Sequence, residues 1–171
     1  MKQTNFMYQA SVPVFKQLLT ALNAILDKAQ VHVISHKMAP DALLQASLFP
    51  EMFNFIRQVQ IATDFAKGVS ARLAGVEVPA YEDHELSFNE LKARIEKTLL
   101  FIASINPEQF HGSEEKEIIT RPGTPKEKQF SGLNYLLNYG LPQFFFHVTT
   151  AYDILRNQGV EVGKRDYMGA F

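Results

Sequence analysis

Four long stretches of the sequence repeat their apolar residues at the three- and four-residue spacing of an amphipathic helix. In the first stretch, the apolar positions are Phe15, Leu18, Leu19, Leu22, Ile25, Leu26, Ala29 and Val33. The four stretches contain no run of alternating apolar and polar residues of the kind that marks a strand. The pattern therefore predicts an all-α fold, a four-helix bundle built as a single domain over residues 1–171.

Proline and glycine delimit the first two helices. We expect the first helix to begin near Thr4 and to kink at Pro13, which would lose one backbone hydrogen bond there. A start at Pro13 itself, with Ser11 as the cap, is the alternative. The second helix is expected to open at Pro50 and to end before Gly75.

Residues 76–86, VEVPAYEDHEL, form a linker to the third helix. Ser87 and Glu90 match a capping box, in which each side chain accepts a hydrogen bond from a free backbone N–H at the helix start. Two longer connections are expected, at 38–49, which holds one short helical turn, and at 106–130.

The sequence around the fourth helix departs from the helical pattern. Within residues 113–130, EIIT and EKQF are expected to pair as a short β-hairpin, with a disordered loop as the alternative. The fourth helix is expected over 132–157, with a bend caused by Gly140 and Pro142. The tail, residues 160–171, is expected to pack back on the bundle. Its apolar side chains, which would then be buried, are Tyr167, Met168 and Phe171.

Composition excludes several classes of partner and site. With 17 Lys+Arg and 18 Asp+Glu, the net charge of -1 gives no general attraction to nucleic acid or to an anionic membrane. The absence of cysteine excludes disulfides, thiolate metal sites and thiol nucleophiles. No apolar run approaches the roughly 18 residues that suggest a membrane span. A cytoplasmic protein is the default expectation.

His147 is the candidate catalytic residue, because it follows three phenylalanines on a helix that looks buried. Its neighbours one turn away, Gln143 and Ala151, are not strong metal ligands. A neutral imidazole in an apolar wall needs one hydrogen-bond donor and one acceptor. We expect His147 to point toward the second helix near Gln60. Thr150 and Tyr152 are expected to contribute to the same pocket.

Three interpretations of His147 stay open at this point. It could be a hydrogen-bonded core residue, a catalytic or ligand-binding residue, or a single metal ligand. In each case burial would lower the pKa of the histidine and keep it neutral at pH 7.

The second helix supplies further pocket candidates. Arg57, Gln60 and Asp64 are spaced i, i+3 and i+7 and therefore project from one side. They form either a solvated polar edge or a buried cluster in which each group must find a partner. In the second case Arg57 would suit a carboxylate or phosphate ligand.

His32 and His36 are four residues apart, so they share one helical face. Such a pair is typical of a partly exposed patch that completes a helix end, and metal binding is the alternative. His84 and His111 lie in polar connections.

Four blocks of the sequence resemble one uncharacterised bacterial family of unknown function in the DinB/YfiT-like superfamily of inferred metalloenzymes. The blocks are FMYQASVPVF, PEMFNFIRQVQIATDFAKG, ARLAGVEVP and FHVTTAYDILRNQGVEVGKRDYMG. The resemblance covers nearly the whole chain. It implies a bundle of the up-down-down-up type with a long crossover, often as a dimer. The apolar run Phe144–Phe146 also favours a homodimer, because three successive residues cannot all face one core.

The same resemblance implies a metal, often nickel or zinc, held by one histidine of the second helix and two of the last helix. The last-helix pair would fall on His147 and Ala151, and the second-helix ligand near Gln60. Because only one of these places keeps a histidine, we expect no intact tri-histidine site.

The expected function is therefore small-ligand binding or regulation, with a polar pocket and no resident cofactor. One alternative is an enzyme with a remodelled site that uses His147 alone or with a divalent metal (Ni, Zn or Fe), comparable to the thiol-dependent transferases and hydrolases. A second alternative is a structural dimerisation module.

Overall fold

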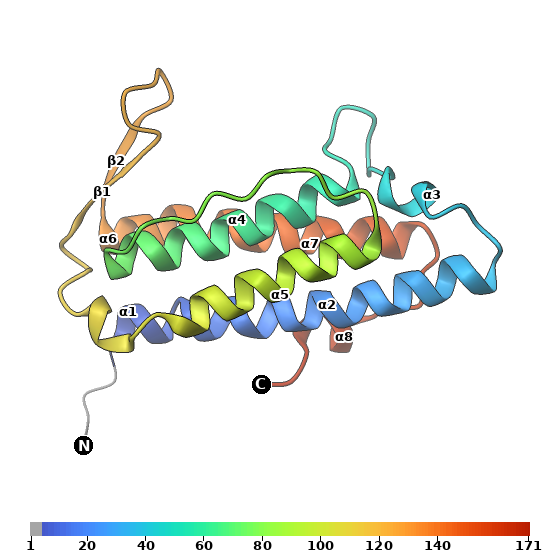
Figure 1. The fold of residues 1–171 in the computed structure, drawn as a ribbon, viewed down its shortest axis with the longest axis horizontal. Coiled ribbons are helices and arrows are strands. Elements are labelled where there is room, and N and C mark those ends of the chain that lie inside the picture. The colour runs from blue at the N-terminus through green and yellow to red at the C-terminus, as the bar shows by residue number, and fades with distance from the viewer. Residues whose placement is uncertain (1–4) are drawn as a thin grey trace.

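The computed structural model describes residues 5–171, and its fold is mainly helical, as predicted (Figure 1). The four long helices are α2 (Val12–Ser35), α4 (Phe55–Ala74), α5 (Phe88–Ser104) and α7 (Leu141–Asn157). The shorter helices are α1 (Phe6–Gln9), α3 (Asp41–Leu44), the 3-10 helix η1 (Pro107–Phe110), α6 (Gly132–Asn134), the π-helix η2 (Tyr135–Gly140) and α8 (Lys164–Met168). Among these residues, no helix combines the length and apolarity needed to cross a membrane.

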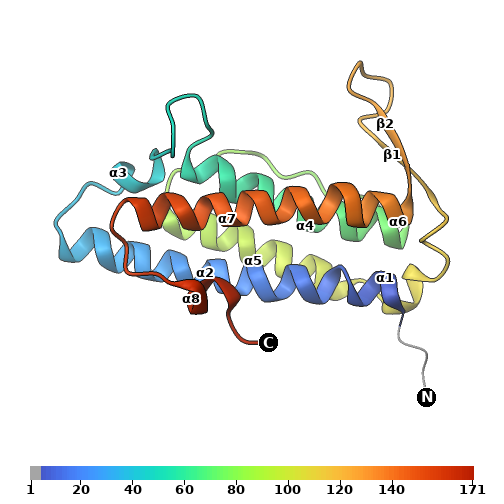
Figure 2. The ribbon, with the colours of Figure 1, turned by 180° about the vertical axis from the view of Figure 1, so that it is seen from behind.

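The long helices lie side by side around one apolar core (Figures 1 and 2). Helix α4 packs against both α5 and α7, and α2 packs against the same two helices. In the core, the rings of Phe15 and Phe144 meet edge to face at 4.8 Å. Helices α4 and α5 run in the same direction, because residues 75–87 return along them as an extended strap (Figure 1). This strap positions one of the two polar clusters described below.

The first two long helices begin differently from the prediction. Thr4 lies outside the described residues, and the break between α1 and α2 falls at Ser11, two residues before Pro13. The Ser11 hydroxyl donates to the Met7 carbonyl at 2.6 Å. The predicted start of the second helix at Pro50 is wrong. Asn54 is the cap instead, because its side chain accepts the Arg57 N–H at 2.9 Å.

The ends of α4 and α5 follow the sequence signals more closely. Gly75 closes α4 in the left-handed region, with φ of 74°. At the start of α5, the Ser87 hydroxyl oxygen accepts the Glu90 N–H at 3.2 Å. The Glu90 carboxylate accepts the N–H of Leu86 at 2.8 Å. In the usual capping box it would accept the N–H of the cap residue itself, Ser87.

The predicted hairpin is present as an antiparallel pair, β1 (Glu117–Thr120) and β2 (Lys128–Ser131). Its second strand begins one residue later than expected. Where a bend was predicted at Gly140 and Pro142, the chain forms the π-helical stretch η2, which ends at Gly140, two residues before Pro142. Glycine is required there, because a Cβ on Gly140 would lie 2.7 Å from a methyl group of Val69 on α4.

The tail folds back on α2, as predicted for most of its length. Val160 and Val162 are buried, and the Gln17 amide of α2 donates to the Met168 carbonyl at 2.8 Å. Tyr167 is half-buried. The burial predicted for Phe171 is wrong, since its side chain lies fully exposed beyond Gly169.

Candidate functional site

His147 lies on the face of α7 that packs against α4, and only 7% of it is exposed. Its Nδ1 is 2.7 Å from Oε1 of Gln58 on α4. The expected direction was therefore correct, but the expected partner, Gln60, was not. Gln60 is two residues further along α4, about 200° around the helix axis, and it faces the strap.

The Gln58 amide determines which nitrogen of His147 carries the proton. Gln58 Nε2 donates to the Phe53 carbonyl at 3.2 Å, so Oε1 is the atom that remains to accept. His147 Nδ1 must then be the donor in the 2.7 Å contact. Within residues 5–171, Nε2 of His147 has no hydrogen-bond partner, and it is not among the fully buried unpaired atoms. This nitrogen therefore presents a free lone pair.

Burial, and to a smaller extent the positive charge of Arg57, lower the pKa of His147 from 6.5 to about 4. The imidazole is consequently neutral at pH 7. A base of this strength is a poor proton acceptor at neutral pH but a good hydrogen-bond acceptor. The site can hold a donor group in place more readily than it can remove a proton.

Aromatic rings border the imidazole. The Phe65 ring is nearly parallel to it, at 6.1 Å and 15°, and the Phe146 ring meets it edge to face at 5.2 Å. Phe146 is 55% exposed, so this border continues to the surface. One turn before His147, Gln143 lies in a pocket of about 320 Å³. The pocket is lined by Asn138, Tyr139, Pro142, Gln143 and Phe146.

Two other predicted pocket residues are engaged elsewhere. The Thr150 hydroxyl donates to the Phe146 carbonyl of its own helix at 2.7 Å. The Tyr152 ring packs edge to face on Tyr167 of the tail, at 5.9 Å. Gln143 is therefore the predicted polar neighbour whose side chain stays beside the aromatic border of His147.

Arg57, Gln60 and Asp64 belong to a second polar cluster, between α4, α5 and the strap. Gln60 accepts from Arg57 at 3.1 Å and donates to Glu85 of the strap at 2.8 Å. Arg57 also pairs with Asp83. Asp64 pairs with Lys67 of its own helix at 2.9 Å. The spacing correctly predicted that the three residues project from one side of the helix. As in the second alternative given above, each of them has a hydrogen-bond or ion-pair partner within the protein.

Arg94 of α5 is the centre of this cluster, and the sequence reasoning missed it. Its guanidinium donates to Thr63 at 2.8 Å, to Asp64 at 2.9 Å and to Glu85 at 3.0 Å. The available signal was a charged residue at an inward position of α5, three residues after the buried Leu91. Burial lowers the pKa of Arg94, but the hydrogen bond to Glu85 and the charge of Asp64 outweigh it and raise the pKa.

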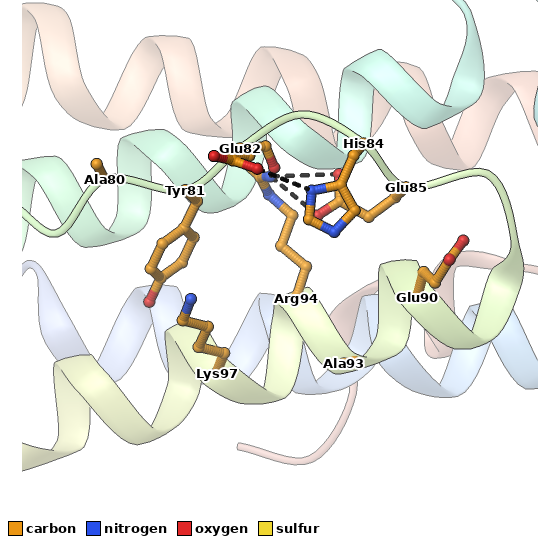
Figure 3. Close-up of a pocket in the computed structure, with 9 residues that line it drawn as sticks. All are labelled: Ala80, Tyr81, Glu82, His84, Glu85, Glu90, Ala93, Arg94 and Lys97. Carbon is orange, nitrogen blue, oxygen red and sulfur yellow. Dashed lines mark hydrogen bonds and ion pairs between the residues drawn. The ribbon is translucent and has the colours of Figure 1, made fainter.

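The strap residues around Arg94 border a pocket of about 460 Å³ (Figure 3). The Tyr81 ring lies 3.7 Å from the Lys67 ammonium and 4.1 Å from that of Lys97. Burial raises the pKa of Glu85, but hydrogen bonds from Gln60 and Arg94 are stronger and leave it below its usual value. The cluster therefore fixes the strap on α4 and α5, and its charged groups already have partners.

The residues around His147 do not fit a tri-histidine metal centre. Across residues 5–171, no group of three or more His, Cys, Asp or Glu side chains is placed to hold a metal ion. The positions next to His147 carry the methyl group of Ala151, one turn along α7, and the amide of Gln58, whose oxygen is already paired.

The arrangement of the helices is that of a DinB-like protein. A crystal structure described as a DinB family member protein from Shewanella denitrificans matches with a TM-score of 0.92 and 38% identity, over 98% of this chain and 94% of that one. The model for the domain of unknown function DUF1993 matches residues 7–168. The chain belongs to the DUF1993 family, which confirms the resemblance noted in the sequence. No curated protein matches it.

Proposed function

We propose that this protein binds a small ligand through His147, at the face shared by α4 and α7, and acts without a tri-histidine metal centre. The observation that carries the proposal is the orientation of the Gln58 amide. Because that amide holds Nδ1–H, the lone pair of Nε2 is directed away from Gln58 and available to a ligand. The ligand group that fits is an N–H or O–H donor.

Preorganisation favours binding by such a residue. The imidazole is fixed by Gln58 and bordered by Phe65 and Phe146, so little side-chain freedom is lost when a ligand docks. The low pKa of His147 keeps the acceptor neutral and unprotonated across the physiological range. A role in recognition or regulation uses this property directly, whereas general base catalysis near pH 7 does not.

The alternative is an enzyme with a remodelled site, comparable to thiol-dependent transferases or hydrolases. One observation favours it: metal-bound histidines usually donate their second ring N–H to a fixed acceptor, and His147 does so to Gln58. In that case His147 would be the single protein ligand of a nickel, zinc or iron ion.

NMR titration with a panel of small amides, alcohols and azoles, observed on both the ligand and the histidine rings of the protein, tests the proposal. We expect donor-bearing compounds to bind the wild type at pH 7, to shift the His147 ring resonances, and to lose binding to His147→Phe. Equal binding to both proteins, or no effect of any compound on His147, would overturn the proposal. Metal analysis of untagged protein tests the alternative. One equivalent of nickel, zinc or iron that disappears in His147→Phe would establish it.

We further propose that the long helices form a single four-helix bundle of the up-down-down-up type, assembled as a cytoplasmic homodimer. The parallel course of α4 and α5 supports the topology (Figure 1). The exposed rings of Phe145 and Phe146 support the dimer.

A further inference from the structure

The C-terminal end of α2 carries two histidines side by side. The rings of His32 and His36 stack with their centroids 4.1 Å apart and their planes at 28°. Residues four apart on a helix share one face, so both imidazoles project into the same region. This region lies away from His147 and from the Arg94 cluster, and neither of those sites uses the pair.

A backbone contact sets the tautomer of the neutral His36 ring. Its Nδ1 is 3.0 Å from the carbonyl oxygen of His32, which can only accept a hydrogen bond. Nδ1 therefore carries the hydrogen, and Nε2 carries the lone pair. Histidines that bind metals usually have this arrangement, with the second ring N–H donated to a carbonyl or a carboxylate. His36 therefore presents its free lone pair on Nε2, and rotation of the two rings out of their stack would bring this nitrogen and one of His32 onto the same ion.

A pocket of about 500 Å³ adjoins the pair. Two of its charged residues are already paired: Asp27 with Lys92, and Lys28 with Asp166 at 2.7 Å. Glu161, from the segment that follows α7, lines the same pocket and is exposed. Its carboxylate forms no ion pair within residues 5–171. The pocket thus offers two imidazoles and one available carboxylate.

We propose that His32 and His36 chelate a divalent transition-metal ion, with water in the remaining positions and Glu161 reached through water. Imidazole nitrogens suit copper, nickel and zinc, and the affinity of such sites rises from nickel to copper. Two protein ligands give an exchangeable ion that dialysis removes, because no third His, Cys, Asp or Glu converges on the pair in the described part of the chain. This site does not depend on the function proposed for His147.

Calorimetric titration of untagged protein with Cu²⁺ and Ni²⁺ tests the site. We expect one equivalent to bind, with Cu²⁺ tighter than Ni²⁺. Either His32→Gln or His36→Gln should weaken binding by at least about tenfold, since a two-point chelate becomes a single contact. The matched controls are His84→Gln and His111→Gln, which remove other exposed histidines and should leave the affinity unchanged.

Paramagnetic broadening locates the ion. Substoichiometric Cu²⁺ should broaden the amide signals of residues 32–36 and of Gly159, which lines the same pocket. Both histidines are at the helix end, so the variants should keep the wild-type circular dichroism spectrum. Undiminished Cu²⁺ affinity in a variant that carries both His32→Gln and His36→Gln, or broadening centred on another histidine, would overturn the proposal.

Discussion

The side-chain amide of Gln58 is hydrogen-bonded at both its nitrogen and its oxygen, and this determines the tautomer of His147. The nitrogen donates to the Phe53 carbonyl and the oxygen accepts from the imidazole. A buried amide bound at both ends has no alternative orientation without leaving a polar atom unpaired. The identity of this single side chain therefore sets which nitrogen of His147 is free.

Gln58→Glu should raise the pKa of His147 from about 4 to at least its ordinary value of 6.5. The carboxylate would lie opposite Nδ1 and stabilise the imidazolium. An NMR titration of the His147 ring measures the shift. Gln129→Glu, which places the same charge on the exposed hairpin, should leave the titration unchanged. An unaltered pKa in Gln58→Glu would show that the two side chains do not interact in solution.

The same pKa predicts how stability depends on pH. The unfolded histidine titrates near 6.5 and the folded one near 4, so the unfolded state binds more protons between these values. Stability should rise with pH across this interval and be lost as pH falls, by up to about 3 kcal/mol from this group. Urea unfolding of wild type and His147→Phe at pH 4.5, 5.5 and 7 isolates the contribution. If the free energies of unfolding of the two proteins changed equally with pH, His147 would not contribute to the pH dependence.

At the level of elements, the strap at residues 75–87 depends on Arg94. Arg94→Met should cost about 3–5 kcal/mol, because it leaves the buried Glu85 carboxylate without its cationic partner. Urea unfolding measures the loss, and amide exchange in the strap should accelerate. Arg57→Met is the matched control, since the Arg57–Asp83 pair is partly exposed and should contribute about 1 kcal/mol or less. Equal losses in the two variants would contradict the central role of Arg94.

The sequence alone was sufficient to predict those helices and strands that are determined by residues close together in the chain. Helical periodicity, the Ser87 cap, Gly75 and the hairpin depend on residues close together in the chain. The start of α4 was misplaced, because Pro50 and Asn54 are both acceptable starts and the tertiary position of the preceding loop selects Asn54.

The site was harder to predict, because it depends on contacts between distant segments. Gln58 and Gln60 are chemically identical, and only the rotation of α4 relative to α7 decides which one meets His147. Arg94 is stable inside the protein only because the strap brings Glu85 to it, 9 residues away along the chain and on another element. No periodicity encodes that pairing.

At the scale of the whole molecule, the apolar surface bears on assembly. Phe145 and Phe146 remain 37% and 55% exposed after the chain has folded. Light scattering at micromolar concentration should give the mass of a homodimer, and Phe146→Ser should shift the equilibrium toward the monomer by removing apolar contact area. Phe171→Ser, at the exposed chain end, is the control and should leave the mass unchanged. A wild-type monomer would contradict the dimer.

Long-range ¹H–¹⁵N correlation of the histidine side chains at pH 7 reports the tautomer and the charge of the His147 ring, on which the proposed ligand binding depends. We expect a neutral ring for His147, with a protonated Nδ1 and a free Nε2, in protein purified without a tag. An Nε2–H tautomer, or a charged imidazolium at pH 7, would contradict the pairing with Gln58 and the ligand-binding function derived from it.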